Sequence, residues 1–402
     1  MRKTTLAIAI FFLASIVALA GACTAAPTPT PTKAPAPTQA PVATVAPAVA
    51  TKPAAAAATA APAVATKAPA VATQAVAPAP AKVAVQPLSP PFKMKVGVAG
   101  SAVDAGFYIP YEKGYYKELG LDVELVNFAN GLLVVPPLGT GQLDAGGGGV
   151  NVALFNMILR GIPLKIVADK SHAEPGNMGI GFLLRKDLLD SGAVKTPADL
   201  KGRVLSLPSR GSTQEHMAEI LLAQGGLTLD DMDMKMLQVP DQIAAFANKS
   251  IDIGHAFEPT VTTAKEMGVA VLWKGDHELL PYREGSAILY SANFQKQTEA
   301  AKRFMIAYIK GVRDYNDAFF KKKGTEEVIA IMAKHSTQKD PNVLRKLAAQ
   351  AINPDGYAYP EALQGDIDYF VRTGQMTPLD IKQVIDHQYV DYALQVLGKY
   401  PK

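Results

Sequence analysis

The sequence has few of the residues that build disulfides, metal sites and nucleophilic active sites. Its 402 residues include one cysteine, which excludes a disulfide within the chain. The six histidines are scattered and show no metal-ligand spacing such as H-x-x-x-H, and no Gly-x-Ser-x-Gly motif is present. We therefore expect no metal, no cofactor and no enzymatic activity.

An excess of charge of one sign is also lacking. Lysine and arginine total 40 and aspartate and glutamate total 36, which gives a formal net charge of +4. The basic residues are dispersed and form no stripe with interleaved aromatic residues, which is the usual footprint of a nucleic-acid site. We expect no nucleic-acid partner.

Long apolar runs are absent except near the N-terminus. There, the positive start Met1-Arg2-Lys3 is followed by an apolar run from Ala7 to Ala20 and then by small residues. The run is shorter than the roughly 20 residues that span a bilayer as a helix. This order of charge, apolar core and small residues predicts a secretory signal peptide over residues 1–22.

The single cysteine stands at the end of this signal. Cys23 directly follows Ala-Gly-Ala, which resembles the bacterial lipobox, although Ala20 occupies a position where leucine is usual. The resemblance implies that cleavage leaves Cys23 as a lipid-modified N-terminus. A plain signal peptide with a chance cysteine is the alternative. We predict a lipid anchor at the extracytoplasmic face of the cell membrane.

Residues 23–91 are a low-complexity segment of Ala, Pro, Thr and Val. From Thr24 to about Pro90 the segment has no aromatic residue and no hydrophobic periodicity, so it cannot bury enough surface to offset its ordering entropy. Its proline content favours an extended, semi-stiff spacer. We predict a disordered tether, followed by a folded part of about 310 residues that is long enough for two lobes.

The folded part alternates between short apolar strands and helical segments. This alternation predicts an α/β fold with mainly parallel sheets, followed by helices over 297–320, 325–334 and 341–350 and two more within 374–402. Ligands of open α/β sheets bind beyond the carboxyl ends of the strands. Those ends are expected at Gly97–Gly106, Gly146–Asn151, Ser206–Thr213 and His255–Thr260.

Five segments in order resemble the type II periplasmic substrate-binding proteins of ABC importers, in the branch that holds nitrate, alkanesulfonate, thiamine-pyrimidine and riboflavin binders. The segments begin with GFYIPYEKGYYKELGLDVELVNF, LGTGQLDAGGGGVNVALF, TPADLKGRVLSLPSRGSTQEHM, QIAAFANKSIDIGHAFEP and SAILYSANFQKQTEAAKRF. Each motif is weak alone, and their order over about 230 residues carries the resemblance.

The resemblance implies a two-lobed fold with a hinge and with the ligand in the cleft. Lobe one would comprise residues 92–181 and 285–402, and lobe two residues 182–284. A monomer would capture a small molecule and deliver it to an ABC permease and its ATPase. An enzyme on the same fold is an alternative, but the Cys-rich motif of a fungal pyrimidine-forming relative is absent. A receptor that signals to a membrane kinase is a further alternative.

Lobe one supplies four predicted ligand contacts. Asp104, Phe107 and Tyr108 follow the first strand, where a carboxylate and two aromatic rings suit a flat polar ligand. Asn151 follows the glycine run 146–149, whose backbone N–H groups could hold polar or anionic groups. The alternatives are a loop aspartate, two core aromatics and an ordinary turn.

Lobe two supplies the remaining five predicted contacts. Ser209, Arg210 and Thr213 precede or open a helix and offer hydroxyls and a guanidinium to polar oxygens. Glu258 in the sequence FEP could accept hydrogen bonds from a ring N–H, and Tyr282 could stack on a ring. Helix capping and links to the backbone are the alternatives.

These side chains favour a flat, polar heterocycle as the ligand. Riboflavin is the first expectation, which would mean vitamin uptake, and a thiamine-precursor pyrimidine is the second. A small oxyanion such as a sulfonate, taurine or nitrate is the alternative. It is the less favoured ligand, because Arg210 is the only obvious anion-binding side chain of the set.

Overall fold

The computed structural model describes residues 84–176 and 178–401. The predicted signal peptide 1–22, Cys23 and the tether up to residue 83 lie outside the described residues. The last tether residues are packed on the fold, because Arg303 Nε donates to the Gln86 carbonyl (3.0 Å) and Leu88 N donates to the Leu119 carbonyl (3.2 Å). The folded part therefore begins several residues before Phe92.

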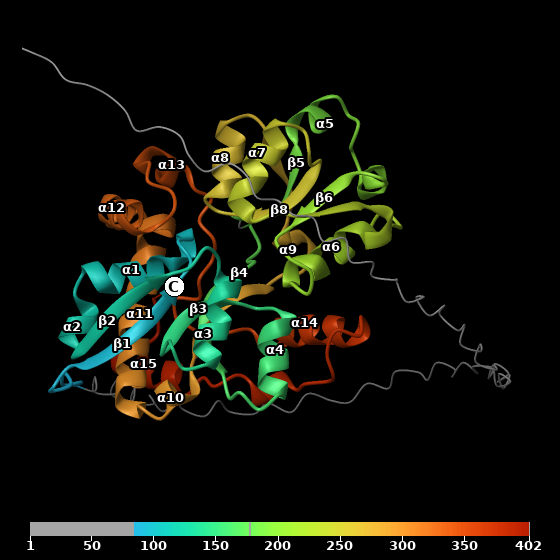
Figure 1. Cartoon of the computed structure of the whole chain (residues 1–402). Helices are drawn as coiled ribbons and strands as arrows, with labels where there is room; N and C mark the ends of the chain where they lie inside the picture. The colour runs from blue at the N-terminus through green and yellow to red at the C-terminus, as the bar shows by residue number, and fades with distance from the viewer. Residues whose placement is uncertain (1–83, 177, 402) are drawn as a thin grey trace, which may run out of the picture. The chain divides into compact units, whose positions relative to one another are not determined.

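The first sheet contains five strands in the order β2-β1-β3-β10-β4 (Figure 1). Strands β1, β2 and β3 are parallel, and β10 runs antiparallel to both β3 and β4. The bounds are β1 Phe92–Val98, β2 Leu121–Asn127, β3 Ala145–Gly149, β4 Lys165–His172 and β10 Glu284–Tyr290.

The second sheet has the corresponding order β7-β6-β8-β5-β9, with β5 as its one reversed strand. Its bounds are β5 Ile180–Arg185, β6 Val204–Leu207, β7 Asp233–Met236, β8 Ile253–Phe257 and β9 Ala270–Gly275. In each sheet the reversed strand is the first one after the chain crosses from the other sheet. The expected two-lobed α/β fold with mainly parallel sheets is confirmed.

The strand pairing places the lobe borders slightly earlier than the predicted ones. Ile180 already pairs with Phe257 of the second sheet, and Glu284 already pairs with His172 of the first. The chain therefore changes sheets before residues 180 and 284, rather than after residues 181 and 284.

Helices surround both sheets (Figure 1). Their bounds are α1 Ala105–Glu112, α2 Tyr115–Glu118, α3 Val135–Gly139, α4 Val152–Leu159, α5 Lys186–Asp190, α6 Thr213–Ala223, α7 Gln242–Ala247, α8 Thr260–Glu266, α9 Asp276–Leu279, α10 Ala292–Gln295, α11 Thr298–Phe320, α12 Thr325–His335, α13 Pro341–Lys346, α14 Pro360–Arg372 and α15 Gln388–Leu397. Short 3-10 turns are η1 Ala102–Asp104, η2 Gly131–Val134, η3 Pro197–Leu200, η4 Leu229–Asp231, η5 Val239–Asp241 and η6 Ile381–Gln383.

The C-terminal helices differ from the expectation in one place. Helix α14 was not predicted, and only the turn η6 and α15 form within 374–402. Helix α14 buries Leu363, Ile367 and Phe370. These apolar residues have the i, i+4, i+7 spacing of an amphipathic helix, so the sequence did contain the signal.

The core of lobe one forms where α1 packs on the long helix α11. Phe107 is fully buried, and its ring centroid lies 6.4 Å from that of Phe304 and 5.4 Å from that of Tyr308. Tyr108 is also buried and stacks on His335. Both predicted site aromatics of α1 therefore contribute to packing within lobe one.

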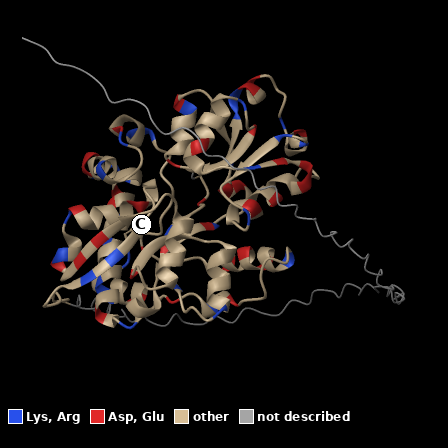
Figure 2. Ribbon diagram, in the orientation of Figure 1, with Lys and Arg blue, Asp and Glu red and all other residues tan. Residues whose placement is uncertain are grey.

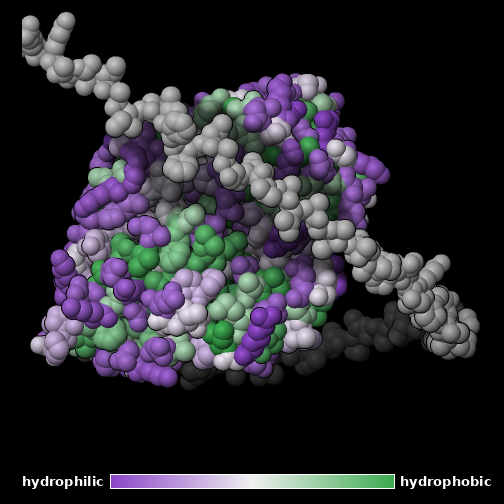
Figure 3. Space-filling view, in the orientation of Figure 1, coloured by the Kyte–Doolittle hydropathy of each residue, from purple (hydrophilic) through white to green (hydrophobic). Residues whose placement is uncertain are grey.

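Charged and polar residues are spread over the face of the described residues that Figures 2 and 3 show. Blue and red residues are interspersed in Figure 2, in agreement with the dispersed charges of the sequence. On the face shown in Figure 3, polar residues separate the apolar patches. Among the described residues, no helix has the length and apolar character needed to cross a membrane.

The packing of Phe107 predicts a large effect on stability. Phe107→Ala should lower the free energy of unfolding by about 3–5 kcal/mol, because the cavity left by a buried ring is only partly filled by relaxation. Urea denaturation of the full chain measures this. Tyr111→Ala, on the same helix but 42% exposed, is the matched control. Equal, small effects of both changes would contradict the core position of Phe107.

Candidate functional site

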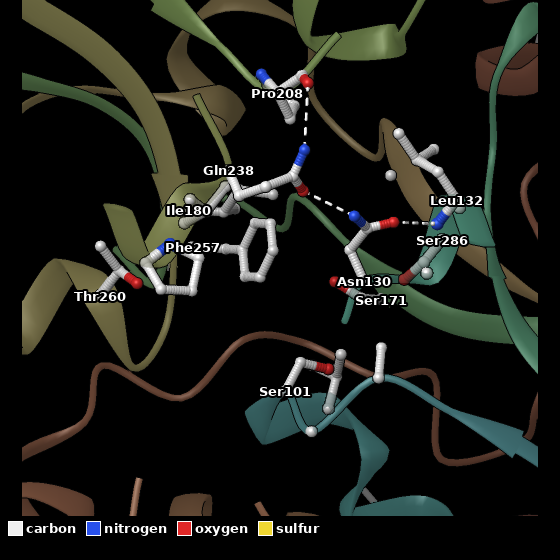
Figure 4. Close-up of a pocket in the computed structure, with 18 of the residues that line it drawn as sticks. Ser101, Asn130, Leu132, Ser171, Ile180, Pro208, Gln238, Phe257, Thr260 and Ser286 are labelled. Atoms are coloured by element: carbon white, nitrogen blue, oxygen red, sulfur yellow. Dashed lines mark hydrogen bonds between the residues drawn. The ribbon is translucent and has the colours of Figure 1, made fainter. Parts of the chain in front are cut away.

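A cavity of about 110 Å³ lies between the two sheets and is lined by residues of both lobes (Figure 4). All four predicted strand-end segments contribute to its wall. Their lining residues are Ala99, Gly100, Ser101 and Val103 after β1, Gly149 at the end of β3, Pro208 after β6, and Phe257, Pro259 and Thr260 around the end of β8. The expectation that the ligand cleft lies at these strand ends agrees with this arrangement.

Other segments complete the wall and were not predicted. They are the turn after β2, the end of β4, the start of β5, the first turn of α6, the segment after β7, the start of β10 and two positions of the C-terminal region. Their lining residues are Ala129, Asn130, Gly131, Leu132, Lys170, Ser171, Ile180, Gln214, Gln238, Val239, Pro240, Gly285, Ser286, Thr337 and Gln350. The reversed strand β10 and the C-terminal segments reach the cavity only through the tertiary fold.

The cavity wall combines apolar surface with uncharged polar groups. The hydroxyl groups belong to Ser101, Ser171, Thr260, Ser286 and Thr337, and the carboxamides to Asn130, Gln214, Gln238 and Gln350. Phe257 supplies the one aromatic ring among the described lining residues (Figure 4). Amide and hydroxyl groups both donate and accept, so this wall suits a ligand with polar edges and an apolar face.

Lys170 is the one charged side chain among the described lining residues. It is buried, and its Nζ lies 3.0 Å from Asp104 Oδ1. The other carboxylate oxygen of Asp104 accepts hydrogen bonds from Ala99 N (3.0 Å), Ser101 N (2.9 Å) and Ser101 Oγ (2.9 Å). The cavity therefore contains a compensated ion pair and no unpaired charge.

The glycine run of β3 makes room for this lysine. A Cβ at position 147 would lie 2.6 Å from Lys170 Cδ and 2.9 Å from Phe107 Cε2. All five residues of β3 are buried, and Gly149 is the member of the run that lines the cavity. Most of the run thus serves close packing, while the predicted role of its N–H groups in binding stays a prediction.

A chain of amide hydrogen bonds joins the two lobes at the cavity (Figure 4). Asn130 Nδ2 of lobe one donates to Gln238 Oε1 of lobe two (2.5 Å), and Gln238 Nε2 donates to the Pro208 carbonyl (3.5 Å). Asn130 Oδ1 accepts from Leu132 N (3.0 Å) and Leu133 N, which caps η2. The contact between lobes is therefore built on a fixed helix cap.

Further contacts between the lobes surround the cavity. Val152 N of lobe one donates to the Gly211 carbonyl of lobe two (3.0 Å). Ala348 N donates to Glu258 Oε1 (2.9 Å), and His216 Nδ1 lies 2.7 Å from Asp366 Oδ1. These contacts come from separate elements, so the lobes touch at several points around the cavity.

The predicted contacts of lobe one bond to protein groups. Asp104 pairs with Lys170, and Phe107 and Tyr108 lie in the core. Asn151 caps α4, because its Oδ1 accepts from Leu154 N (2.8 Å). None of the four is among the residues that line the cavity, so their contact with a ligand stays a prediction.

The predicted contacts of lobe two also have protein partners. The Ser209 carbonyl accepts from Ser212 Oγ, and the exposed Arg210 pairs with Glu215 (2.8 Å). Thr213 Oγ1 accepts from the buried Arg283. None of these side chains lines the cavity, although their neighbours Pro208 and Gln214 do.

Glu258 and Tyr282 complete the predicted set. Glu258 is fully buried and accepts from Thr262 N (3.0 Å), Thr262 Oγ1 (2.7 Å) and Ala348 N. Burial raises the pKa of this carboxyl. Tyr282 stacks on Tyr359 with ring centroids 5.3 Å apart and is 43% exposed. Both lie outside the cavity wall.

A second buried acidic group lies where the chain returns to lobe one. Glu284 is fully buried, and its burial and the neighbouring Asp169 raise its pKa well above the usual value. Asp169 already accepts from Asn353 N (2.7 Å) and lies 2.8 Å from His172 Nδ1. The strand beside the cavity therefore begins with a carboxyl group that is kept neutral.

No cluster of three or more potential metal-ligating side chains occurs in the described part of the chain.

The sequence matches the family described as NMT1/THI5 like over residues 102–317, which is more than half of the chain. The chain belongs to the NMT1/THI5-like family. The match spans the second sheet entirely and includes the turn η1, whose last residue is Asp104, and most of α11.

A curated relative of this chain, from Brucella abortus, is named a binding protein. It is 28% identical over 298 residues, which cover 71% of this chain and 86% of the relative. A binding protein of Brucella melitensis matches to the same extent.

Solved structures share the fold. The nitrate-binding protein of Synechocystis PCC 6803 has a TM-score of 0.64 and 18% identity, covering 77% of this chain and 89% of its own. A ligand-binding component of an ABC-type import system from Staphylococcus aureus has a TM-score of 0.62 and 18% identity, covering 75% and 99%. The aliphatic sulphonate-binding protein of Escherichia coli has a TM-score of 0.59 and 20% identity, covering 75% and 99%. These neighbours establish the two-lobed binding-protein fold.

Removal of the amide contact between the lobes should make the cleft open more often. Gln238→Met should accelerate hydrogen exchange of the Val152 amide by about two- to tenfold, because one hydrogen bond contributes about 0.5–1.5 kcal/mol to closure. Mass spectrometry of peptides that contain Val152 measures this. Gln224→Met, on the exposed end of α6, should leave exchange unchanged. Equal exchange in both variants would contradict the role of Gln238 in closure.

The neutral carboxyl of Glu284 predicts a pH dependence of stability. The native state holds this proton at a pH where the unfolded state has lost it, so unfolding should become easier as pH rises above the ordinary pKa of a glutamate in the unfolded chain. Glu284→Gln mimics the neutral form and should flatten the dependence. Urea denaturation at several pH values measures it, with the exposed Glu361→Gln as control. A slope unchanged in Glu284→Gln would contradict the assignment.

Proposed function

We propose that the protein is the substrate-binding component of an ABC importer, held at the extracytoplasmic face of the cell membrane by lipid on Cys23. The family, the two-lobed fold and the binding-protein names of the relatives support the receptor role. A permease and its ATPase would be the partners. The signal-like N-terminus and the lipobox resemblance support the anchor.

For the ligand we propose a small, uncharged, polar heterocycle. The observation that carries this proposal is the cavity wall, in which amides and hydroxyls accompany one compensated ion pair. The buried side-chain oxygens of Gln214 and Gln350 have no hydrogen-bond partner among the described residues. Buried acceptors are normally satisfied, so a ligand with N–H donors would complete them.

The size of the cavity favours a ligand with one ring over a ligand with three rings. Pockets for drug-sized ligands enclose about 300–1,000 Å³, whereas this cavity encloses about 110 Å³. A thiamine-precursor pyrimidine fits that limit better than riboflavin, which would require a wider cleft. The preference among heterocycles therefore moves from riboflavin to a pyrimidine-type ligand.

A small oxyanion is the second candidate. Lys170 reaches the cavity, and two neighbours of the same fold are named for binding nitrate and sulphonate. An oxyanion would have to share Lys170 with Asp104, which lowers its gain from the lysine. The predicted anion ligand Arg210 lies outside the cavity wall and already pairs with Glu215.

Calorimetric titration of the full chain separates these ligands. We expect a 4-aminopyrimidine to bind, riboflavin to bind more weakly, and taurine and nitrate to give no heat of binding. Binding of taurine or nitrate without binding of the aminopyrimidine would reject the heterocycle in favour of the oxyanion. A chain that binds none of the four would contradict the proposed ligand classes.

A further inference from the structure

We propose that Asp104 determines the charge of the accepted ligand by neutralising Lys170 in the cavity wall. This inference rests on the proposed function, because it concerns the same cavity. Asp104 does not line the cavity and acts through the lysine, so it is a positioning residue for specificity. Removing its charge should turn a site for neutral ligands into a site for anions.

The charge of Lys170 is isolated from water and from charged groups other than Asp104. Its side chain is 3% exposed and that of Asp104 is fully buried, so water screens their interaction little. The other buried charges near the cleft have partners of their own, since Arg283 pairs with Asp276 (2.7 Å) and Glu258 is held by Thr262 and Ala348. No second described group of the wall can take over the role of Asp104.

Lys170 has little room to move. The backbone of Gly147 leaves space for its methylene groups, and a side chain at that position would collide with them. Phe107, which would also meet a Cβ at position 147, is fully buried against α11. Lys170, which lines the cavity, is thus confined against β3 with its Nζ 3.0 Å from Asp104 Oδ1.

Asp104 is fixed independently of the lysine. Two backbone N–H groups and one hydroxyl hold its Oδ2, which leaves Oδ1 for Lys170. An entering anion would meet an ammonium group that is already compensated and would lie close to a fixed carboxylate. Juxtaposed like charges disfavour a ligand strongly, so the wild-type cavity should select against anions.

Three probes of the same tetrahedral shape test this. Methanesulfonate is an anion, dimethyl sulfone is neutral and trimethylsulfoxonium is a cation. In the full chain, calorimetry should show a preference for the sulfone over both ions. Asp104→Asn should raise the affinity for methanesulfonate relative to the sulfone by at least about tenfold, as expected for one charge-assisted hydrogen bond.

Lys170→Met provides a second, independent variant. It leaves the Asp104 carboxylate uncompensated and should shift preference toward trimethylsulfoxonium by a similar factor. The double variant Asp104→Asn, Lys170→Met should return to the neutral sulfone. A merely structural role of Asp104 would weaken all three probes alike and would not reverse the order of preference.

Two results would overturn the inference. One is a wild-type chain that prefers methanesulfonate to the sulfone, and the other is an Asp104→Asn variant whose preference does not change or which binds no methanesulfonate. If Asp104→Asn does not fold, an unchanged order of preference in Lys170→Met overturns it instead. Binding of the aminopyrimidine to the wild-type chain tests the proposed function separately, so the two failures are distinguishable.

Discussion

The buried ion pair between Lys170 and Asp104 is the interaction on which the site depends. A charge in an apolar interior is costly unless a partner and hydrogen bonds compensate it. Asp104 meets this requirement with three hydrogen-bond donors on one oxygen and the lysine on the other. The same residue ends η1 and directly precedes α1. The pair therefore connects the cavity wall to the helix that packs on the core of lobe one.

The contact between the lobes at the cavity uses neutral side chains. The lobes meet at the cavity through Asn130 and Gln238, two neutral side chains that each use both ends of the amide group. Because a neutral hydrogen bond contributes only about 1 kcal/mol net, such a contact can form and break as the cleft closes and opens. Fully buried ion pairs, by contrast, lie within one lobe, as Lys170 with Asp104 and Arg283 with Asp276 do. Charged groups also join the lobes, since Glu258 accepts from Ala348 N and Arg372 pairs with Glu219, but these side chains do not line the cavity.

The fold was predictable from the sequence, and the identity of the residues that line the cavity was not. Strand and helix alternation and the glycines after strands place the cleft segments correctly. Within those segments, however, Asp, Asn, Ser and Thr first satisfy backbone groups at helix starts, as Asn151 does at α4 and Glu258 at α8. In the sequence KIVADKSH, nothing distinguishes Lys170 from a lysine on the exposed face of an ordinary strand. Its burial depends on Gly147 and Asp104, which are distant in sequence and adjacent only in the folded chain.

The reversed strand β10 explains why the lobe crossing and the cavity are coupled. It returns from lobe two and pairs with both β3 and β4, so it lies between the glycine run and the strand of Lys170. Its first residue, Glu284, is a buried neutral carboxyl beside Asp169, and the next two residues line the cavity. Because Ser286 pairs with Ser171 of β4 and with Gly149 of β3, the start of β10 belongs to the same sheet as Lys170. The crossing from lobe two therefore ends directly at the cavity wall.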